Sequence, residues 1–177
     1  MQNKNWINEL FQHMSWADAC VWKSVSELPQ AINDIQIHER LYHIHAAQHA
    51  FYQIWNENPF DIPELSAFKE LDQLLQWAKE YYKQLPNYCD GLDQSKLDHK
   101  IIIPWEKHIE KKFGKTPHAC TLVQTMLQVI SHSTYHRGQL NSELRRLDGT
   151  PPLIDYLVWI WQGKPKAHWL KSIEPSN

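Results

Sequence analysis

Two histidines one helical turn apart, His132 and His136, are the residues best placed to do chemistry in this chain. They lie in the segment His-Ser-Thr-Tyr-His-Arg-Gly-Gln-Leu at residues 132–140. Residues at i and i+4 stand on the same side of a helix. Two imidazoles can therefore direct one nitrogen each at a single ion, at roughly 2.0–2.1 Å for zinc. Because the chain holds 11 histidines, the spacing alone leaves open that the two are ordinary surface residues.

A metal site of the catalytic type needs a third protein ligand. The candidates lie together in an earlier helical segment: His38, His43, His45 and His49. Periodicity does not choose among them, because the stripe of large apolar residues favours His45 and the face of small residues favours His43. No aspartate or glutamate lies one turn from the histidine pair on its inward side. Glu143 is about two turns away.

Four long helices are predicted to position these histidines, because apolar residues recur at helical spacing in four segments. The segments are residues 4–28, 37–56, 64–85 and 117–147. Pro29 and Pro86 are expected to end the first and the third, with a connector over residues 30–36. Thr116 and Pro117 are expected to cap and begin the fourth.

Residues 90–115 have the weakest helical pattern. The β-branched run at residues 100–105 predicts a short strand or an extended loop, and residues 113–115 would close a loose hairpin. A short helix is expected over residues 153–161. The predicted fold is therefore all-α: one domain over residues 1–177, a four-helix bundle with a long irregular connection, including a short β hairpin, before the last long helix. Both His132 and His136 are expected to point into the bundle, whose core commonly holds metal sites.

Composition narrows the function classes. The formal charge of −2 predicts no nucleic-acid or membrane-surface partner. Three widely spaced cysteines argue against a disulfide scaffold and fit a reducing compartment. No apolar run approaches the roughly 18 to 20 residues of a membrane span, so we expect a cytoplasmic protein. Nine tryptophans favour an aromatic core, and those near the C-terminus would suit a homodimer interface.

Four short motifs give the chain a family resemblance. They are Leu10-Phe11 through Trp16-Ala17, Leu41-Tyr42-His43-Ile44, the His-x-x-x-His-Arg-Gly-Gln of residues 132–139, and the Pro-Pro-x-x-Asp of residues 151–155. In this order they resemble the DinB-like superfamily of damage-inducible, metal-binding four-helix proteins, which includes thiol transferases related to the bacillithiol and mycothiol enzymes. The resemblance spans residues 6–161.

The resemblance implies a three-histidine site of His43, His132 and His136, usually described with zinc or nickel. Two positions depart from the family pattern: Tyr135 stands where many relatives have a further histidine, and Gln48 where many have an acidic residue. The second departure weakens the case for a carboxylate general base beside the metal.

Several neighbours of the site have alternative roles. Tyr135 either donates a proton or packs, and Arg137 and Gln139 are expected to hold the helix against other elements. Asp155 either orients a ligating imidazole or caps the last short helix.

The activity that the resemblance implies is transfer of a low-molecular-weight thiol to an electrophile, a small-molecule substrate. The alternatives are a metal-dependent hydrolase and a non-catalytic metal-binding stress-response protein. A metal-free bundle would require His132 and His136 each to have a protein hydrogen-bond partner. The sequence leaves the catalytic side chains unidentified.

Overall fold

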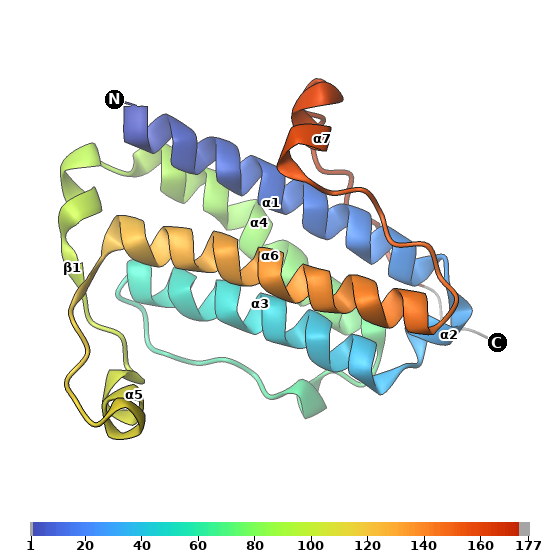
Figure 1. Cartoon of the computed structure of the whole chain (residues 1–177), viewed down its shortest axis with the longest axis horizontal. Helices are drawn as coiled ribbons and strands as arrows, with labels where there is room; N and C mark the ends of the chain where they lie inside the picture. Colours follow the sequence, from blue (N-terminus) through green and yellow to red (C-terminus); the bar gives the residue numbers. More distant parts are fainter. Residues whose placement is uncertain (1, 174–177) are drawn as a thin grey trace.

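Four long helices form the body of the computed structural model, which describes residues 2–173. They are α1 (Gln2–Ser26), α3 (Ile35–Trp55), α4 (Leu71–Gly91) and α6 (Leu122–Arg146). Helices α1 and α3 each pack against both α4 and α6. Helices α1 and α6 run in one direction along the bundle and α3 and α4 in the other (Figure 1). The predicted all-α four-helix bundle is confirmed.

Shorter elements join these helices. They are α2 (Pro29–Ile32), the 3-10 turns η1 (Leu65–Ala67) and η2 (Gln94–Asp98), β1 (Lys100–Ile101), α5 (Glu106–Phe113), β2 (Cys120–Thr121) and α7 (Tyr156–Trp161). Strands β1 and β2 pair antiparallel, with Lys100 opposite Thr121. The predicted small hairpin therefore exists, but residues 113–115 do not form its turn. A whole helix, α5, lies between the strands and ends at Gly114, whose φ of 69° suits a residue without a Cβ atom.

Two predicted helix boundaries were wrong because capping side chains determine them. Helix α4 begins at Leu71, where the Gln73 side-chain oxygen accepts a hydrogen bond from the Glu70 backbone N–H at 3.2 Å. Helix α6 begins after Thr121, whose N–H donates to the Gln124 side chain at 2.9 Å. This reciprocal capping box satisfies N–H groups that a helix start leaves free. The Thr-Pro pair at residues 116–117 lies in the preceding loop.

The two predictions made from prolines had different outcomes. Pro86 lies inside α4, and the helix continues for one more turn that buries Cys89. A proline inside a helix removes one backbone hydrogen bond, and here the burial that follows it offsets the loss. Helix α1 ends at Ser26, before Pro29 as predicted, and Pro29 itself begins the short helix α2, as the first helical position allows.

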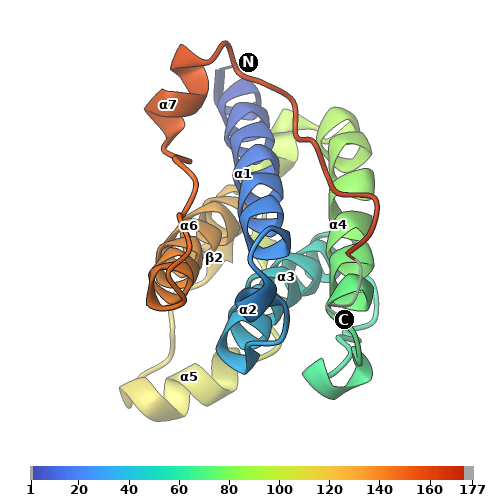
Figure 2. The same cartoon turned by 90° about the vertical axis from the view of Figure 1, so that its right-hand side faces the viewer.

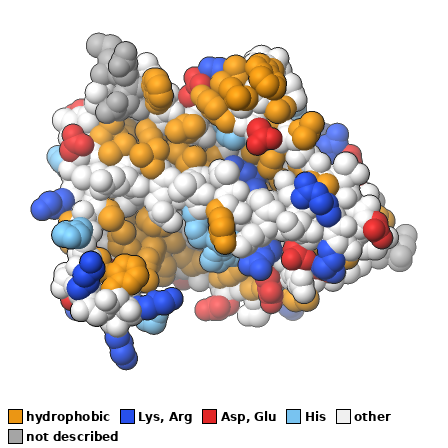
Figure 3. All heavy atoms as spheres, viewed as in Figure 1, with side chains coloured by type: hydrophobic (Ala, Val, Ile, Leu, Met, Phe, Trp, Pro, Cys, Tyr) orange, Lys and Arg blue, Asp and Glu red, His pale blue; other side chains and the backbone are white. Residues whose placement is uncertain are grey.

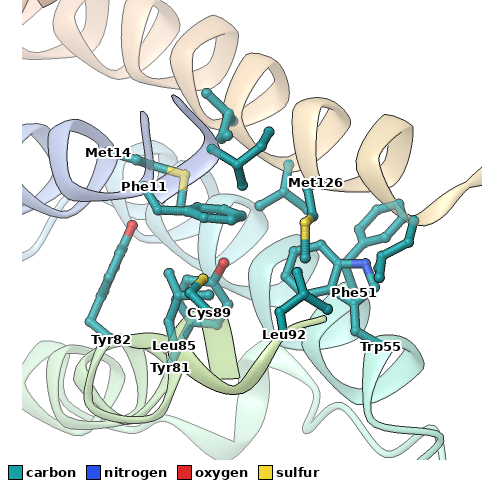
Figure 4. Close-up of a cluster of buried hydrophobic side chains, with 14 of the residues drawn as sticks. Phe11, Met14, Phe51, Trp55, Tyr81, Tyr82, Leu85, Cys89, Leu92 and Met126 are labelled. Atoms are coloured by element: carbon teal, nitrogen blue, oxygen red, sulfur yellow. The ribbon is translucent and has the colours of Figure 1, made fainter. Parts of the chain in front are cut away.

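The main core lies at the end of the bundle where α3 ends and α6 begins, and it is rich in rings. Figure 4 shows Phe11 and Met14 from α1 beside Tyr81, Tyr82 and Leu85 from α4, with Phe51, Trp55 and Met126 farther along. Met14, Tyr81 and Met126 are fully buried. Apolar burial of this kind contributes roughly 1.5–3 kcal/mol per large side chain, and it fixes the helices side by side.

A buried polar network crosses the centre of the bundle and takes side chains from all four long helices. The Asp18 carboxylate on α1 pairs with the Arg137 guanidinium on α6 at 2.7 Å, and the two side chains are 2% and 3% exposed. The Gln48 amide on α3 donates to Asp18 at 2.8 Å, and the Tyr82 hydroxyl on α4 also donates to Asp18. Burial alone would raise the pKa of Asp18, but the charge of Arg137 and these hydrogen bonds lower it below its usual value.

The chain after α6 wraps around the bundle. Helix α7 packs on α1 through the buried Trp159, and the last segment crosses α1 and continues along α4 (Figure 2). Trp169 anchors this segment, because its ring lies 5.0 Å from that of Tyr82 and its N–H donates to Ser15. No helix in residues 2–173 is both long and apolar enough to cross a membrane.

The network yields a stability prediction. Asp18→Asn should lower the free energy of unfolding by about 3–5 kcal/mol, because it leaves the Arg137 charge buried without a counter-charge. Urea unfolding followed by circular dichroism measures the change. The matched control is Glu80→Gln, which breaks the exposed pair with Lys83 and should cost under about 1 kcal/mol. Equal losses in the two variants would contradict the central role of the buried pair.

Candidate metal centre

Three histidines from two neighbouring helices meet on one face of the bundle. His43 comes from α3, and His132 and His136 come from successive turns of α6. Each offers a ring nitrogen, and the three nitrogens all lie within 4.8 Å of one another. The Nε2 atoms of His43 and His136 face each other at 3.2 Å, and the ring centres of His132 and His136 are 4.3 Å apart. Such a group could hold one metal ion.

Gln139 fixes the tautomer of His136. Its side-chain oxygen lies 2.8 Å from His136 Nδ1. Because an amide oxygen only accepts, Nδ1 carries the hydrogen and Nε2 of the neutral ring keeps a lone pair. The expectation that Gln139 holds α6 against another element was wrong, since it orients a histidine on its own helix.

His132 carries an unsatisfied nitrogen. Its Nε2 atom is buried and has no hydrogen-bond partner among the described residues. Burial, followed by the neighbouring rings of His136 and His43, lowers the pKa of His132 to about 4. Burial and His136 also lower the pKa of His43. Both rings are therefore neutral at neutral pH and present lone pairs, as metal ligands must. An orphaned buried nitrogen argues against the metal-free bundle, because such a group is costly without a partner.

The other histidines of α3 have protein partners instead. His38 donates to the Ile32 carbonyl at 2.6 Å, and His49 donates to the Trp77 carbonyl at 2.9 Å. His45 is fully enclosed: its Nε2 accepts from the Trp22 indole and its Nδ1 donates to Gln48, both at 2.8 Å. The structure thus brings His43 to the pair on α6 and keeps His38, His45 and His49 away from it.

The expectation that His132 and His136 point into the core was wrong. His43 is exposed and the other two are half-buried. Ser133 and Arg137, one position after each histidine of α6, take the inward positions instead. One residue turns a helix by about 100°, and this rotation brings His132 and His136 to the edge that faces α3.

A groove of about 700 Å³ runs along the same face. His43 and His132 line it, together with residues of α3, α6 and the loops at residues 60–64 and 103–105. Figure 3 shows histidine side chains beside a hollow with a hydrophobic floor. The site is therefore open to small molecules.

The remaining predicted neighbours lie around or away from the histidines. Tyr135 is 65% exposed, and its ring edge packs on His136 at 5.0 Å between ring centres. Arg137 holds α6 against α1, as predicted. Asp155 precedes α7 at its N-cap position, although its side chain makes no capping hydrogen bond. Glu143 pairs with Arg146. Gln48 belongs to the interior network.

Comparison with known proteins agrees with this architecture. The sequence model of the DinB family matches residues 1–167. A search of functionally curated proteins finds no match. With a match over nearly its whole length, the chain belongs to the DinB family.

Proposed function

We propose that His43, His132 and His136 bind a divalent metal ion, zinc or nickel, and that the site transfers a low-molecular-weight thiol to an electrophile. The observation that carries the proposal is the convergence of three ring nitrogens around the unpartnered Nε2 of His132. Three protein ligands leave a coordination position open for a substrate.

The metal would supply acidity, since a bound divalent cation lowers the pKa of a thiol at its open position. The thiol proton would pass to solvent, and the sulfur lone pair would form a bond to the electrophilic carbon. The leaving group would depart with its bonding electron pair. The chain's own part is to keep His43 and His132 neutral, to orient His136 through Gln139 and to present the groove beside them.

The donor set favours thiol transfer over hydrolysis. Within residues 2–173, the group of potential ligands contains three histidines and no carboxylate. Hydrolysis often employs a carboxylate that accepts a proton from water, whereas a thiol is acidic enough to be ionised by the metal alone. The open groove supports catalysis over a non-catalytic metal-binding protein, because a purely structural metal site is normally closed.

The predicted homodimer and cytoplasmic location belong to the same proposal. The apolar side chains of Leu157 and Trp161 on α7 are 57% and 77% exposed, and they offer a candidate dimer interface.

Metal content is the first test. Protein purified without an affinity tag should carry about one zinc or nickel per chain, the stoichiometry of a single three-ligand site, and His132→Ala should lose it. Elemental analysis measures both. The control is His118→Ala, which removes an exposed loop histidine and should leave the metal content unchanged. Wild-type protein that takes up neither metal would refute the proposal.

Thiol transfer is the second test. Metal-loaded protein should accelerate conjugation of at least one thiol, from a panel of cysteine, glutathione, coenzyme A, bacillithiol and mycothiol, with 1-chloro-2,4-dinitrobenzene. Absorbance follows the product. His132→Ala and protein stripped with EDTA should react at the uncatalysed rate. Loaded protein that is inactive with every thiol, yet cleaves a nitrophenyl ester, would indicate the hydrolase. Inactivity in both assays would favour the non-catalytic alternative.

The contact between Gln139 and His136 gives a third test. Gln139→Leu should weaken metal binding by about 10–100-fold, the usual loss when a group that orients a ligating histidine is removed. Competition with a chromophoric chelator measures the affinity. Ser142→Ala is the control, since Ser142 lies on the same helix and is exposed. An unchanged affinity in Gln139→Leu would show that the hydrogen bond does not orient the ligand.

A further inference from the structure

The groove beside the three histidines has the dimensions of a substrate site. Its volume of about 700 Å³ falls within the roughly 300–1,000 Å³ of small-molecule pockets. His43 and His132 form part of its wall. A molecule lying in the groove would therefore have one end at the proposed metal.

Small residues create the space. Ala46, Ala47 and Ala50 line the groove along α3, where a larger side chain would fill it. Gln124, Gln128 and Val129 line it along α6. The hollow thus follows from the small side chains on one face of α3.

Aromatic rings line the part of the groove formed by α3 and the two loops. The ring of Trp105 meets Phe51 edge-on at 5.4 Å between centres, and Phe60 lies 5.8 Å from Trp105. Phe60 is 52% exposed, so a molecule in the groove can reach its ring. A planar apolar group that lies against these rings would make further contacts of the same kind, because aromatic pairs are stabilised at separations of about 4.5–7 Å.

No lysine or arginine is among the described residues that line the groove. Among the residues that line it, Glu64 alone bears a formal charge when the histidines are neutral. A carboxylate, sulfonate or phosphate in the groove would lose water without gaining a lysine or arginine partner, which is costly. The metal would neutralise the thiolate sulfur, but it could not also pair with an anion that lies along the apolar wall.

We infer that the groove binds the uncharged, aromatic-sized body of the electrophile and selects against electrophiles that carry an anionic group there. This inference rests on the proposed function, and it defines the substrate class of that site.

Two fluorescent probes that share one skeleton test the inference. N-phenyl-1-naphthylamine is uncharged, and 1-anilinonaphthalene-8-sulfonate adds one negative charge to the same rings. Protein stripped with EDTA should bind the uncharged probe about tenfold or more tightly than the sulfonate, as an unpaired anion costs at least about 1.4 kcal/mol. Fluorescence titration measures both affinities. Sulfonate binding as tight as that of the uncharged probe would overturn the inference.

Matched variants locate the binding. Ala47→Phe fills the groove and should weaken binding of the uncharged probe by more than about tenfold. Circular dichroism checks that the variant is folded. Ile35→Ser alters an exposed apolar residue at the far end of α3 and should leave probe binding unchanged. Glu64→Lys should reduce the preference for the uncharged probe, since it adds a cation to the wall. Probe binding that survives Ala47→Phe would place it elsewhere and refute the inference.

These outcomes separate the two proposals, because probe binding requires neither metal nor turnover. If the protein binds no metal but Ala47→Phe weakens probe binding, the proposed function is refuted and the groove remains a binding site for uncharged ligands. If the protein binds metal and transfers a thiol but prefers the sulfonate probe, the proposed function stands and this inference is refuted.

Discussion

The buried ion pair of Asp18 and Arg137 is the interaction on which the rest of the structure depends. Two charges out of water are costly unless hydrogen bonds satisfy their remaining atoms. Here Gln48 and Tyr82 both donate to Asp18, and Arg137 also donates to Thr134 at 2.9 Å. Because the partners come from all four long helices, the network can be completed only when each helix has one rotation and one height. Apolar packing brings the helices together, and this network selects a single arrangement.

The geometry of the histidines follows from that constraint. Ser133 accepts a hydrogen bond from Gln48 at 3.1 Å, and Ser133 and Arg137 directly follow His132 and His136. Once the inner residues are fixed, the histidines must face α3. On α3 itself, Gln48 is held inward and His43 lies about 140° away around the helix, toward α6. The positions of the three histidines are thus set by groups outside the histidine cluster, which is how a scaffold preorganises a site.

Periodicity of apolar residues was enough to predict the four helices, because each buries one stripe. It was not enough for rotation: Ser133 and Arg137 occupy inward positions that a hydrophobic pattern assigns to apolar residues, so His132 and His136 were placed inside. Periodicity also could not identify His43 as the third histidine of the site. His45 is the buried histidine of α3, so a hydrophobic pattern favours it, and the family motif was needed to select His43. The Thr-x-x-Gln capping box at residues 121–124 was visible in the sequence, and the Thr-Pro pair before it was chosen instead. The partnership of Asp18 with Arg137 links positions 119 residues apart, beyond the reach of any local pattern.

One polar network crosses the apolar interior of the bundle, while apolar side chains line the groove, and this arrangement has a chemical consequence. The charges of Asp18 and Arg137 compensate each other in the interior, so they add little net field at the histidines. Within residues 2–173, no carboxylate joins the group of three histidines. A divalent cation there would keep its full charge for whatever enters the open position, and a bound metal of this kind becomes the largest local charge. A single thiolate would pair with that charge at the metal, while the uncharged body of the electrophile would lie along the apolar wall. The difference in charge would thus direct the two reactants to different parts of the site before any bond forms.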